Sequence, residues 1–372
     1  MIIGFDAKRA FHNTSGLGNY SRDIIRIMST HFPDNRYLLY NPKKSNVERF
    51  VVNSNVVLKY PDKWIWKKLS SIWRQGPISG QILSDGVDIY HGLSNEIPRG
   101  IDKKRTKVIV TIHDLIFIRF PEFFKPVDRR IYLNKFKYAA QNADLVIAIS
   151  EQTKEDIIRF FKINESKIVV HYQGCHAAFK VAYTTSEKAI VKSRFNLPDR
   201  FILNVGTIEK RKNALTILRA IRDLDVHCVI VGRSTSYKQE LQKFIAENEM
   251  YDRVHFLNNV SMAELAMIYQ MAEMFCYPSF FEGFGIPIIE ALFSGTPVIT
   301  TKGGCFSEAG RPHSVYLEPD DISAWSDTIR SLSSNSDLRM QMAVAGSDYA
   351  KQFEDENVGD NLMSIYKSLI DK

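Results

Sequence analysis

Two glutamates separated by seven residues flank a glycine-rich segment, and this spacing is the strongest chemical pattern in the chain. Glu282 precedes the loop glycines, Gly285 is the last of them, and Glu290 follows. The apolar run 274–277 predicts a buried strand, and Pro287 suits the first turn of a helix. A glycine-rich loop before a helix N-terminus offers backbone N–H groups to an anion, whereas carboxylates accept hydrogen bonds from hydroxyl groups. The combination predicts a site for a phosphorylated sugar or a nucleotide.

A cationic turn in the same half of the chain adds ligands for a diphosphate. The strand expected at 201–205 leads through Gly206 to Arg211 and Lys212, just before a helix. Guanidinium and ammonium groups at such a junction bind phosphate through charge-assisted hydrogen bonds, although the pair alone could also be a solvated charged turn. Because no Asp-x-Asp motif stands at a strand end, we expect diphosphate binding without a metal ion.

The segment 282–290 resembles the signature of the retaining, nucleotide-sugar-dependent glycosyltransferases of family 4, also called group 1 glycosyltransferases. The resemblance extends to the turn 203–213 and to the stretch 109–155, and it is weakest over 40–87. It implies an α/β protein with the GT-B fold, in which two Rossmann-like domains with parallel sheets face each other across a cleft. The alternation of predicted strands and helices along the chain is typical of parallel sheets.

The resemblance also implies roles for individual residues. Arg211 and Lys212 would hold the diphosphate, Glu290 the ribose, and Glu282 the hydroxyls of the transferred sugar. His113, at the end of the strand expected at 107–112, would contact the donor sugar. The expected catalytic residues are His113 and Glu282, and the expected donor-binding residues are Gly16, Gly18, Arg211, Lys212, Gly232, Arg233, Phe284, Gly285, Ile286 and Glu290.

The length of 372 residues fits two domains with a core each. We expect an acceptor-side Rossmann-like domain at 1–182 and a nucleotide-sugar-binding domain at 183–354. By the resemblance, a last helix within 355–372 packs back on the first domain. The four cysteines lack paired spacing, which argues against a disulfide framework or a metal site and fits a reducing compartment.

The net charge of +7 is unevenly placed along the chain. Residues 1–182 hold 29 Lys and Arg against 17 Asp and Glu, whereas the remainder holds 20 against 25. Three of the four tryptophans lie within the basic stretch 63–74, which is either an interfacial membrane segment or a core helix with a solvated face. The stretch 117–130 is likewise aromatic and basic. No nucleic-acid-binding motif, signal peptide or membrane span is found, so we expect a cytoplasmic protein, peripheral at the inner membrane face, with no nucleic-acid partner.

The resemblance implies a retaining hexosyltransferase. It would move a sugar from a nucleotide diphosphate sugar to a glycan or lipid-linked acceptor, in cell-surface polysaccharide synthesis, with no cofactor besides the donor. The turn around 205–213 resembles that of polysaccharide mannosyltransferases, which favours GDP-mannose as the donor. Alternatives are a GT-B sugar-nucleotide epimerase and a non-catalytic subunit that binds nucleotide or sugar. A dinucleotide-dependent dehydrogenase is disfavoured because Ser21 replaces the third glycine of its fingerprint and no acid ends the next strand.

Substitutions at the central positions have expected outcomes from sequence alone. Gln keeps the shape of Glu, so Glu282→Gln and Glu290→Gln are expected to leave the melting temperature near that of the parent. Gly18→Val is expected to obstruct the loop that follows the first strand and to lower activity.

Overall fold

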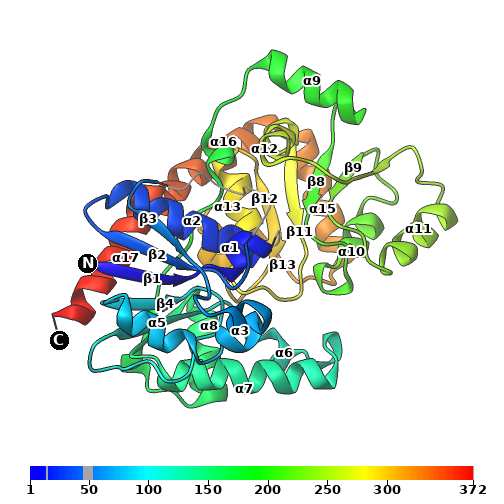
Figure 1. Cartoon of the computed structure of the whole chain (residues 1–372). Coiled ribbons are helices and arrows are strands. Elements are labelled where there is room, and N and C mark those ends of the chain that lie inside the picture. Colours follow the sequence, from blue (N-terminus) through cyan, green and yellow to red (C-terminus); the bar gives the residue numbers. More distant parts are fainter. Residues whose placement is uncertain (14–15, 45–52, 372) are drawn as a thin grey trace. The chain divides into compact units, whose positions relative to one another are not determined.

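The computed structural model describes residues 1–13, 16–44 and 53–371, and the chain divides into two compact units (Figure 1). The first unit comprises Met1–Gly174 together with Glu354–Lys372, and the second comprises Cys175–Phe353. The division therefore falls a few residues before the boundary expected at 182. A short 3₁₀ turn at Ala177–Lys180 lies between this division and the expected boundary.

The first unit is built on a seven-stranded sheet with the order β3-β2-β1-β4-β5-β6-β7. Every strand pair is parallel, as the alternating pattern predicts. The strands are β1 (Ile2–Asp6), β2 (Arg36–Tyr40), β3 (Val56–Lys59), β4 (Ile89–Gly92), β5 (Lys107–Ile112), β6 (Leu145–Ala148) and β7 (Ile168–Val170). The helices are α1 (Lys8–His12), α2 (Gly16–His31), α3 (Trp64–Lys68), α4 (Ser70–Trp73), α5 (Ile78–Ser84), α6 (Ile116–Arg119), α7 (Pro126–Asn142), α8 (Glu151–Asp156) and α17 (Asp355–Ile370).

The second unit holds a six-stranded parallel sheet with the order β10-β9-β8-β11-β12-β13. Its strands are β8 (Ile202–Val205), β9 (Cys228–Val231), β10 (Val254–Leu257), β11 (Met274–Tyr277), β12 (Val298–Thr301) and β13 (Val315–Leu317). Its helices are α9 (Thr185–Phe195), α10 (Ala214–Ala220), α11 (Lys238–Glu247), α12 (Met262–Met271), α13 (Ile286–Phe293), α14 (Phe306–Gly310), α15 (Ile322–Ser334) and α16 (Ser336–Ala350).

Both sheets have the doubly wound arrangement, in which the strand order reverses next to the first strand. The reversal lies between β1 and β4 in the first unit and between β8 and β11 in the second. Open α/β sheets bind ligands outside the carboxyl ends of the strands at this switch point, because the loops on either side run to opposite faces and leave a crevice. The fold thus marks one ligand position in each unit.

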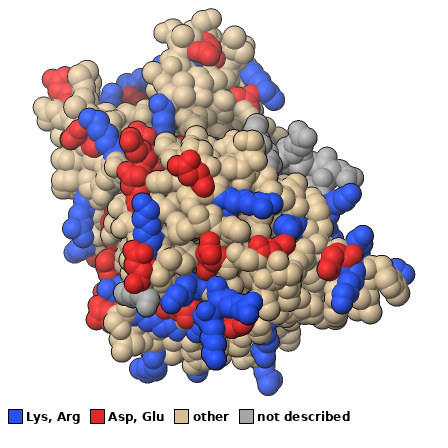
Figure 2. Space-filling model, turned by 60° about the vertical axis from the view of Figure 1, so that its left-hand side comes forward, with Lys and Arg blue, Asp and Glu red and all other residues tan. Residues whose placement is uncertain are grey.

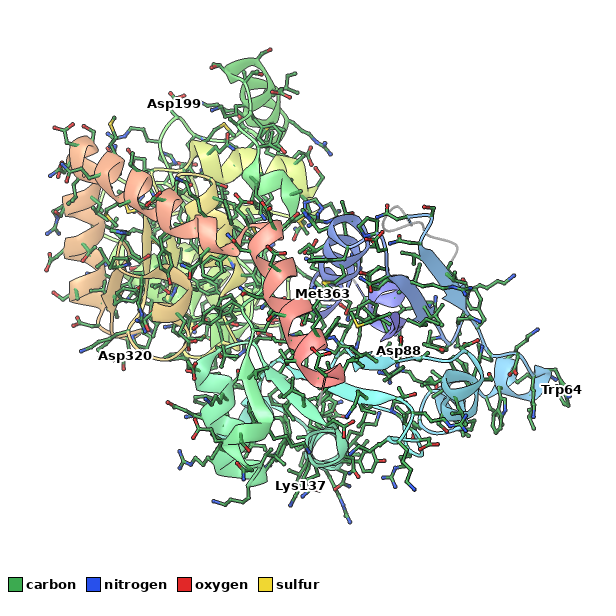
Figure 3. All side chains as sticks on the ribbon, turned by 90° about the vertical axis from the view of Figure 1, so that its left-hand side faces the viewer. Trp64, Asp88, Lys137, Asp199, Asp320 and Met363 are labelled. Carbon is green, nitrogen blue, oxygen red and sulfur yellow. The ribbon has the colours of Figure 1, made fainter. Side chains whose placement is uncertain are left out.

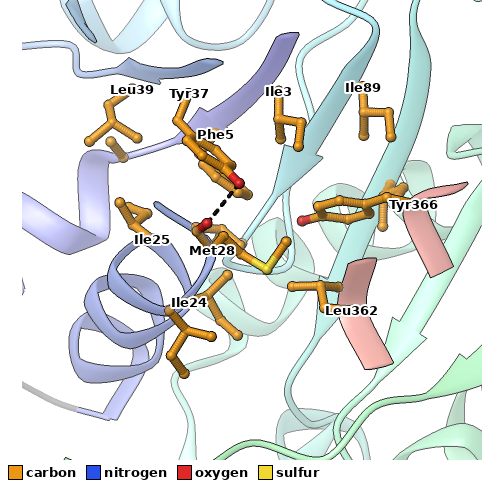
Figure 4. Packing of buried hydrophobic residues seen from close by; sticks show 14 of the residues in the cluster. Ile3, Phe5, Ile24, Ile25, Met28, Tyr37, Leu39, Ile89, Leu362 and Tyr366 are labelled. Atoms are coloured by element: carbon orange, nitrogen blue, oxygen red, sulfur yellow. Dashed lines mark hydrogen bonds between the residues drawn. The ribbon is translucent and has the colours of Figure 1, made fainter. Parts of the chain in front are cut away.

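The last helix, α17, belongs to the core of the first unit. Its buried side chains Leu362 and Tyr366 join a cluster that includes Ile3 of β1 and Met28 of α2 (Figure 4). The hydroxyl of Tyr37 donates a hydrogen bond of 2.7 Å to the carbonyl of Met28 in the same cluster. The amphipathic face of α17 therefore completes the hydrophobic layer that α2 begins.

The tryptophan-rich stretch 63–74 and the residues after it form three short helices, α3, α4 and α5. The first break is at Leu69, whose backbone leaves the helical region, and the second is at Gly76 and Pro77. The breaks let Trp73 turn into the core, where it is 1% exposed, while Trp64 stays 69% exposed. The stretch is therefore half core and half surface.

Candidate donor site

The loops that follow β8 and β11 meet at the switch point of the second sheet. The backbone N–H of Phe280, after β11, donates to the carbonyl of Arg211, after β8, at 3.0 Å. Gly206 directly follows β8 and has a φ of 147°, a conformation that side-chain-bearing residues rarely adopt. The 3₁₀ turn Lys210–Lys212 follows and ends at Asn213 in the left-handed region, just before α10. This geometry directs the cationic turn toward the glycine-rich loop.

Three of the predicted site residues form one largely buried ion cluster there, with side chains that are 11–16% exposed. The Nζ of Lys212 lies 2.5 Å from Oε1 of Glu282, and Nη1 of Arg211 lies 2.9 Å from the same oxygen. Lys212 also donates to the hydroxyl of Tyr277 at 2.7 Å. The second guanidinium nitrogen of Arg211 contacts Glu209 at 2.6 Å. Sequence reasoning placed Glu282 and the two cations at one ligand but did not foresee that they contact each other directly.

The charges of this cluster are strongly coupled. Burial by itself would raise the pKa of Glu282, but the charges of Lys212 and Arg211 outweigh it and lower the pKa to about 2. Burial lowers the pKa of Lys212, and the Glu282 carboxylate opposes that change. Glu282 is therefore ionised at neutral pH, and two cations are concentrated beside it in a water-poor position.

Glu290 lies on α13, the helix that follows the glycine-rich loop. Its carboxylate is 8% exposed and accepts a hydrogen bond of 3.2 Å from the hydroxyl of Tyr269 on α12. Tyr269 was not singled out from the sequence, because a tyrosine inside an apolar helix gives no signal of its partner. The hydroxyl helps to orient the carboxylate in the second turn of α13.

The backbone of the glycine-rich loop is shaped by close packing. Gly285 has a φ of 122° and immediately precedes α13, so the first amides of the helix follow directly from the loop. The side chain of Phe284 is buried against the ring of Phe353, with centroids 5.9 Å apart. The side chain of Phe284 therefore belongs to the packing of this loop.

Gly232 and Arg233 follow β9, next to the cationic turn. A Cβ on Gly232 would lie 1.8 Å from the carbonyl oxygen of Gly206, so only glycine allows the two loops to touch. The carbonyl of Arg233 accepts from the N–H of Ile208, while its side chain is exposed. Gly232 thus acts through the backbone, and Arg233 presents a solvent-facing cation.

His113 ends β5 in the first unit and is held in one tautomer. Its Nε2–H donates to the carbonyl of Leu93 at 2.8 Å, which leaves the lone pair on Nδ1. Burial lowers the pKa of His113 to about 4, so the ring is neutral at physiological pH. The Tyr20 and His113 rings pack edge to face, with their centroids 4.6 Å apart. A neutral imidazole with a lone pair on Nδ1 is suited to accept a hydrogen bond from a hydroxyl group.

His91, the other strand-end histidine, has a structural role. It is fully buried, and its two ring nitrogens are hydrogen-bonded to the hydroxyls of Tyr366 and Thr111 at 2.7 and 2.8 Å. Burial lowers its pKa to about 3, so it is a neutral bridge between α17 and the sheet.

Gly16 and Gly18 lie at the start of α2 and differ in their surroundings. A Cβ on Gly18 would lie 2.1 Å from the carbonyl oxygen of Asn13, whereas a Cβ on Gly16 would meet open space. The expected loss of activity in Gly18→Val would therefore not by itself report on the site, because the substitution also disturbs the packing of α2.

We expect Gly18→Ala to lower the free energy of unfolding by about 2 kcal/mol, since overpacking against backbone cannot be relieved by a rotamer change. Gly16→Ala, two residues away on the same helix turn, is the matched control and should stay within about 0.5 kcal/mol. Urea unfolding of both variants measures the difference. Equal stabilities would contradict the packing described for Gly18.

Comparisons with known proteins agree with this geometry. The model of the Glycosyltransferase Family 4 domain matches residues 27–179, and the model of the Glycosyl transferases group 1 domain matches residues 185–348. The chain belongs to the family-4 glycosyltransferases. The O-antigen chain mannosyltransferase B of Escherichia coli is 27% identical over 289 residues, which are 76% of this chain and 74% of that protein.

Solved structures show that the chain has the GT-B fold of this family, which confirms the predicted fold class. Sucrose-phosphate synthase from Thermosynechococcus elongatus has a TM-score of 0.78 at 18% identity, with 99% of each chain covered. The HepE protein of Anabaena, solved in complex with UDP-glucose, has a TM-score of 0.71 at 17% identity, again with 99% of each chain covered.

Proposed function

We propose that this family-4 glycosyltransferase transfers a hexosyl group, with retention, from a nucleotide diphosphate sugar to a glycan or lipid-linked acceptor. The observation that carries the proposal is the buried cluster of Arg211, Lys212 and Glu282 at the switch point of the second sheet. Two cations held in a water-poor loop stabilise the negative charge that grows on a leaving diphosphate. HepE, a protein of the same fold, is solved with UDP-glucose bound.

In this proposal Glu282 is the protein side chain that contacts the transferred sugar. A carboxylate carries acceptor sites on two oxygens, so it is able to hold both cations and to accept hydrogen bonds from sugar hydroxyls. Its negative charge also favours the positive charge that develops on the sugar ring in the transition state. In this proposal the two cations face the diphosphate and the carboxylate faces the sugar.

A mannosyl donor and a role in surface polysaccharide synthesis are the finer parts of the proposal. They rest on the name of the Escherichia coli relative, an O-antigen chain mannosyltransferase, and on the turn around Arg211 and Lys212. GDP-mannose is accordingly the proposed donor. The diphosphate ligands are cationic side chains and helix amides, so we propose that no metal ion is required.

Contact with the inner face of the membrane is part of the same proposal, and the first unit supplies its surface. Trp64, Ile65 and Ile72 are 69%, 42% and 50% exposed, and Trp64 points outward at the edge of the molecule (Figure 3). The ammonium of Lys68 lies 5.2 Å above the Trp64 ring. Tryptophan interleaved with lysine suits the interface of an anionic membrane, and the activity is proposed to lie on its cytoplasmic side.

The second predicted membrane stretch, 117–130, is only partly on the surface. Phe117 is buried at 3% exposure, whereas Phe123 and Val127 are 37% and 70% exposed. Lys and Arg side chains gather along the lower edge of the face in Figure 2, at the level where Figure 1 draws α7. Within the described residues, no helix has the length and apolar character needed to cross a membrane.

The test of the proposed function is a thermal-shift measurement with nucleoside diphosphates in the presence of EDTA. A ligand at 100 times its dissociation constant adds about 2.7 kcal/mol to the free energy of unfolding, so GDP should raise the melting temperature by several degrees. UDP under the same conditions tests the choice of base. A shift that appears only with Mg²⁺ or Mn²⁺ would overturn metal independence, and no shift with any nucleoside diphosphate would overturn the site.

The ribose role proposed for Glu290 has its own expected result. Glu290→Gln weakens a charge-assisted hydrogen bond that is the same in the ground and transition states, so the donor KM should rise about tenfold while kcat stays within about threefold. Tyr269→Phe removes the hydroxyl that orients Glu290 and should raise KM in the same direction by less. Steady-state kinetics at saturating acceptor measures both. A fall in kcat with unchanged KM would contradict the ribose role.

A further inference from the structure

A chain of buried hydroxyl and imidazole groups crosses the first unit from α17 to α2. The hydroxyl of Tyr366 lies 2.7 Å from Nδ1 of His91, and Nε2 of His91 lies 2.8 Å from Oγ1 of Thr111. The same Oγ1 atom lies 3.0 Å from the hydroxyl of Tyr20, on α2. All four side chains are buried, with exposed fractions of 0–3%. The chain of hydrogen bonds therefore leads from the last helix to the ring of Tyr20.

The ring of Tyr20 is also the aromatic neighbour of His113. The two rings pack edge to face, with centroids 4.6 Å apart. Thr111 precedes His113 by two residues at the carboxyl end of β5, so one tyrosine reaches both. Its hydroxyl contacts Thr111, and its ring contacts His113. Tyr20 therefore connects the buried chain to the imidazole whose Nδ1 carries a lone pair.

The direction of that lone pair depends on how the His113 ring is held. The hydrogen bond from Nε2–H to the carbonyl of Leu93 fixes one corner of the ring. The χ2 torsion of histidine has broad energy wells, so a ring held at one corner is still able to tilt about it. Edge-to-face packing has a preferred geometry, and the Tyr20 ring thus restricts this tilt from one side.

The hydroxyl of Tyr20 in turn restricts the tyrosine ring. A phenylalanine would fill the same space without any buried partner, whereas a buried hydroxyl costs free energy unless it is hydrogen-bonded. The neutral ring of His91 has one donor and one acceptor nitrogen, so it satisfies the hydroxyl on either side of it. Because hydrogen-bonded groups in a low-dielectric interior hold one another in a single arrangement, the chain fixes the position of Tyr20.

We propose that Tyr20 is a positioning residue for His113. The buried chain anchors the Tyr20 ring, and the ring keeps Nδ1 of His113 directed at a hydroxyl of the donor sugar. The inference rests on the proposed function, because a sugar donor gives this nitrogen its partner. Tyr20 acts through the histidine and does not itself touch the donor, so its hydroxyl matters for turnover only while His113 is present.

The kinetic test is a double-mutant cycle, with the release of GDP from GDP-mannose as the measured reaction. Tyr20→Phe removes the hydroxyl and keeps the ring, and it should lower kcat about tenfold because a small misplacement of a group at the reacting centre is costly. In the His113→Ala background the same substitution should change kcat by less than about twofold. Equal losses in the two backgrounds would make Tyr20 a structural residue only and overturn the inference.

Matched variants separate the anchoring hydroxyl from general damage to the core. Thr111→Val removes the hydroxyl that holds Tyr20 and should act like Tyr20→Phe, whereas Thr111→Ser keeps it and should restore the kcat of the parent. Tyr37→Phe is the control for a lost buried phenol, since Tyr37 belongs to the same core cluster but donates to the carbonyl of Met28. A loss in Tyr37→Phe as large as in Tyr20→Phe would contradict the positioning role.

Histidine NMR gives a readout that needs no turnover. In protein labelled with ¹⁵N-histidine, the signal that disappears in His113→Ala reports the tautomer of His113, which carries its proton on Nε2 in the parent. In Tyr20→Phe the released ring should share the proton between both nitrogens. The pKa of His113 should also rise from about 4 toward its ordinary value as water reaches the ring. An unchanged signal and pKa in this variant would rule the inference out.

The outcomes distinguish the inference from the proposed function. A His113→Ala variant with the kcat of the parent rejects the donor contact of His113, and the inference falls with it. A parent that releases no GDP from GDP-mannose rejects the proposed donor, and the NMR signal then decides the positioning by itself. A loss of kcat in His113→Ala together with a parent-like Tyr20→Phe rejects the positioning role alone.

Discussion

Glu282→Gln is expected to lower kcat about 100-fold while changing the donor KM much less. The carboxylate lies where positive charge develops on the transferred sugar, and the neutral amide loses that stabilisation mainly in the transition state. Steady-state kinetics at saturating acceptor measures both constants. A variant that keeps kcat within about twofold would show that Glu282 is only a structural partner of the two cations.

The same substitution is also expected to destabilise the protein, which differs from the expectation based on sequence alone. Gln keeps the shape of Glu but leaves Lys212 and Arg211 buried without their shared counter-ion. Removing one partner of a buried pair costs about 3 kcal/mol or more. Urea unfolding at pH 7 measures the loss, and the kinetic assays must be run well below the lowered melting temperature.

The pH dependence of this stability difference follows from the pKa of Glu282. Its folded-state pKa of about 2 lies below the unfolded value of about 4.3, so the ionised group stabilises the native state above pH 4.3. That contribution falls as the pH drops from 4.3 toward 2. The difference in unfolding free energy between the parent and Glu282→Gln should therefore shrink in acid, and a constant difference down to pH 3 would contradict the ion pairing.

Glu209→Gln is the matched control for Glu282→Gln. Glu209 contacts the same arginine at 2.6 Å, but its side chain is 36% exposed. Exposed ion pairs contribute between zero and about 1 kcal/mol, so this variant should melt close to the parent and keep its kcat. Equal losses in the two variants would mean that charge in general, and not the position of Glu282, governs activity.

Lys212→Ala is expected to lower kcat by about 10² to 10³ and to weaken the binding of GDP. Its ammonium is buried beside Glu282 and the Tyr277 hydroxyl, where a charge acts through a low dielectric on the leaving diphosphate. Arg211→Ala should act in the same direction. Kinetics and titration calorimetry with GDP measure the two effects.

Lys210→Ala provides the control from the same 3₁₀ turn. Lys210 is exposed, whereas the side chain of Lys212 is only 14% exposed, so the two substitutions remove the same side chain from different surroundings in one turn. The Lys210 variant should keep kcat and KM within about twofold. If both lysine variants behave alike, the turn contributes only a diffuse positive field, and the diphosphate contact proposed for Lys212 is wrong.

The sequence by itself determined the parts of this protein that depend on local pattern. Alternating apolar and helical segments predicted two α/β domains, because strand and helix periodicities are local properties. The glycine-rich loop before Pro287 predicted the entry into α13, since backbone freedom and fixed φ act within a few residues. The candidate donor ligands were likewise predicted from local sequence. They are Glu282 and Glu290, by their spacing, and the adjacent pair Arg211 and Lys212.

Only the tertiary structure decided which of these groups touch. The contact of Glu282 with Lys212 joins residues 70 positions apart, and it exists because β8 and β11 are neighbours at the switch point. Trp73 in the core and Trp64 in solvent, or Gly18 against a carbonyl and Gly16 in the open, have similar local sequence and opposite surroundings.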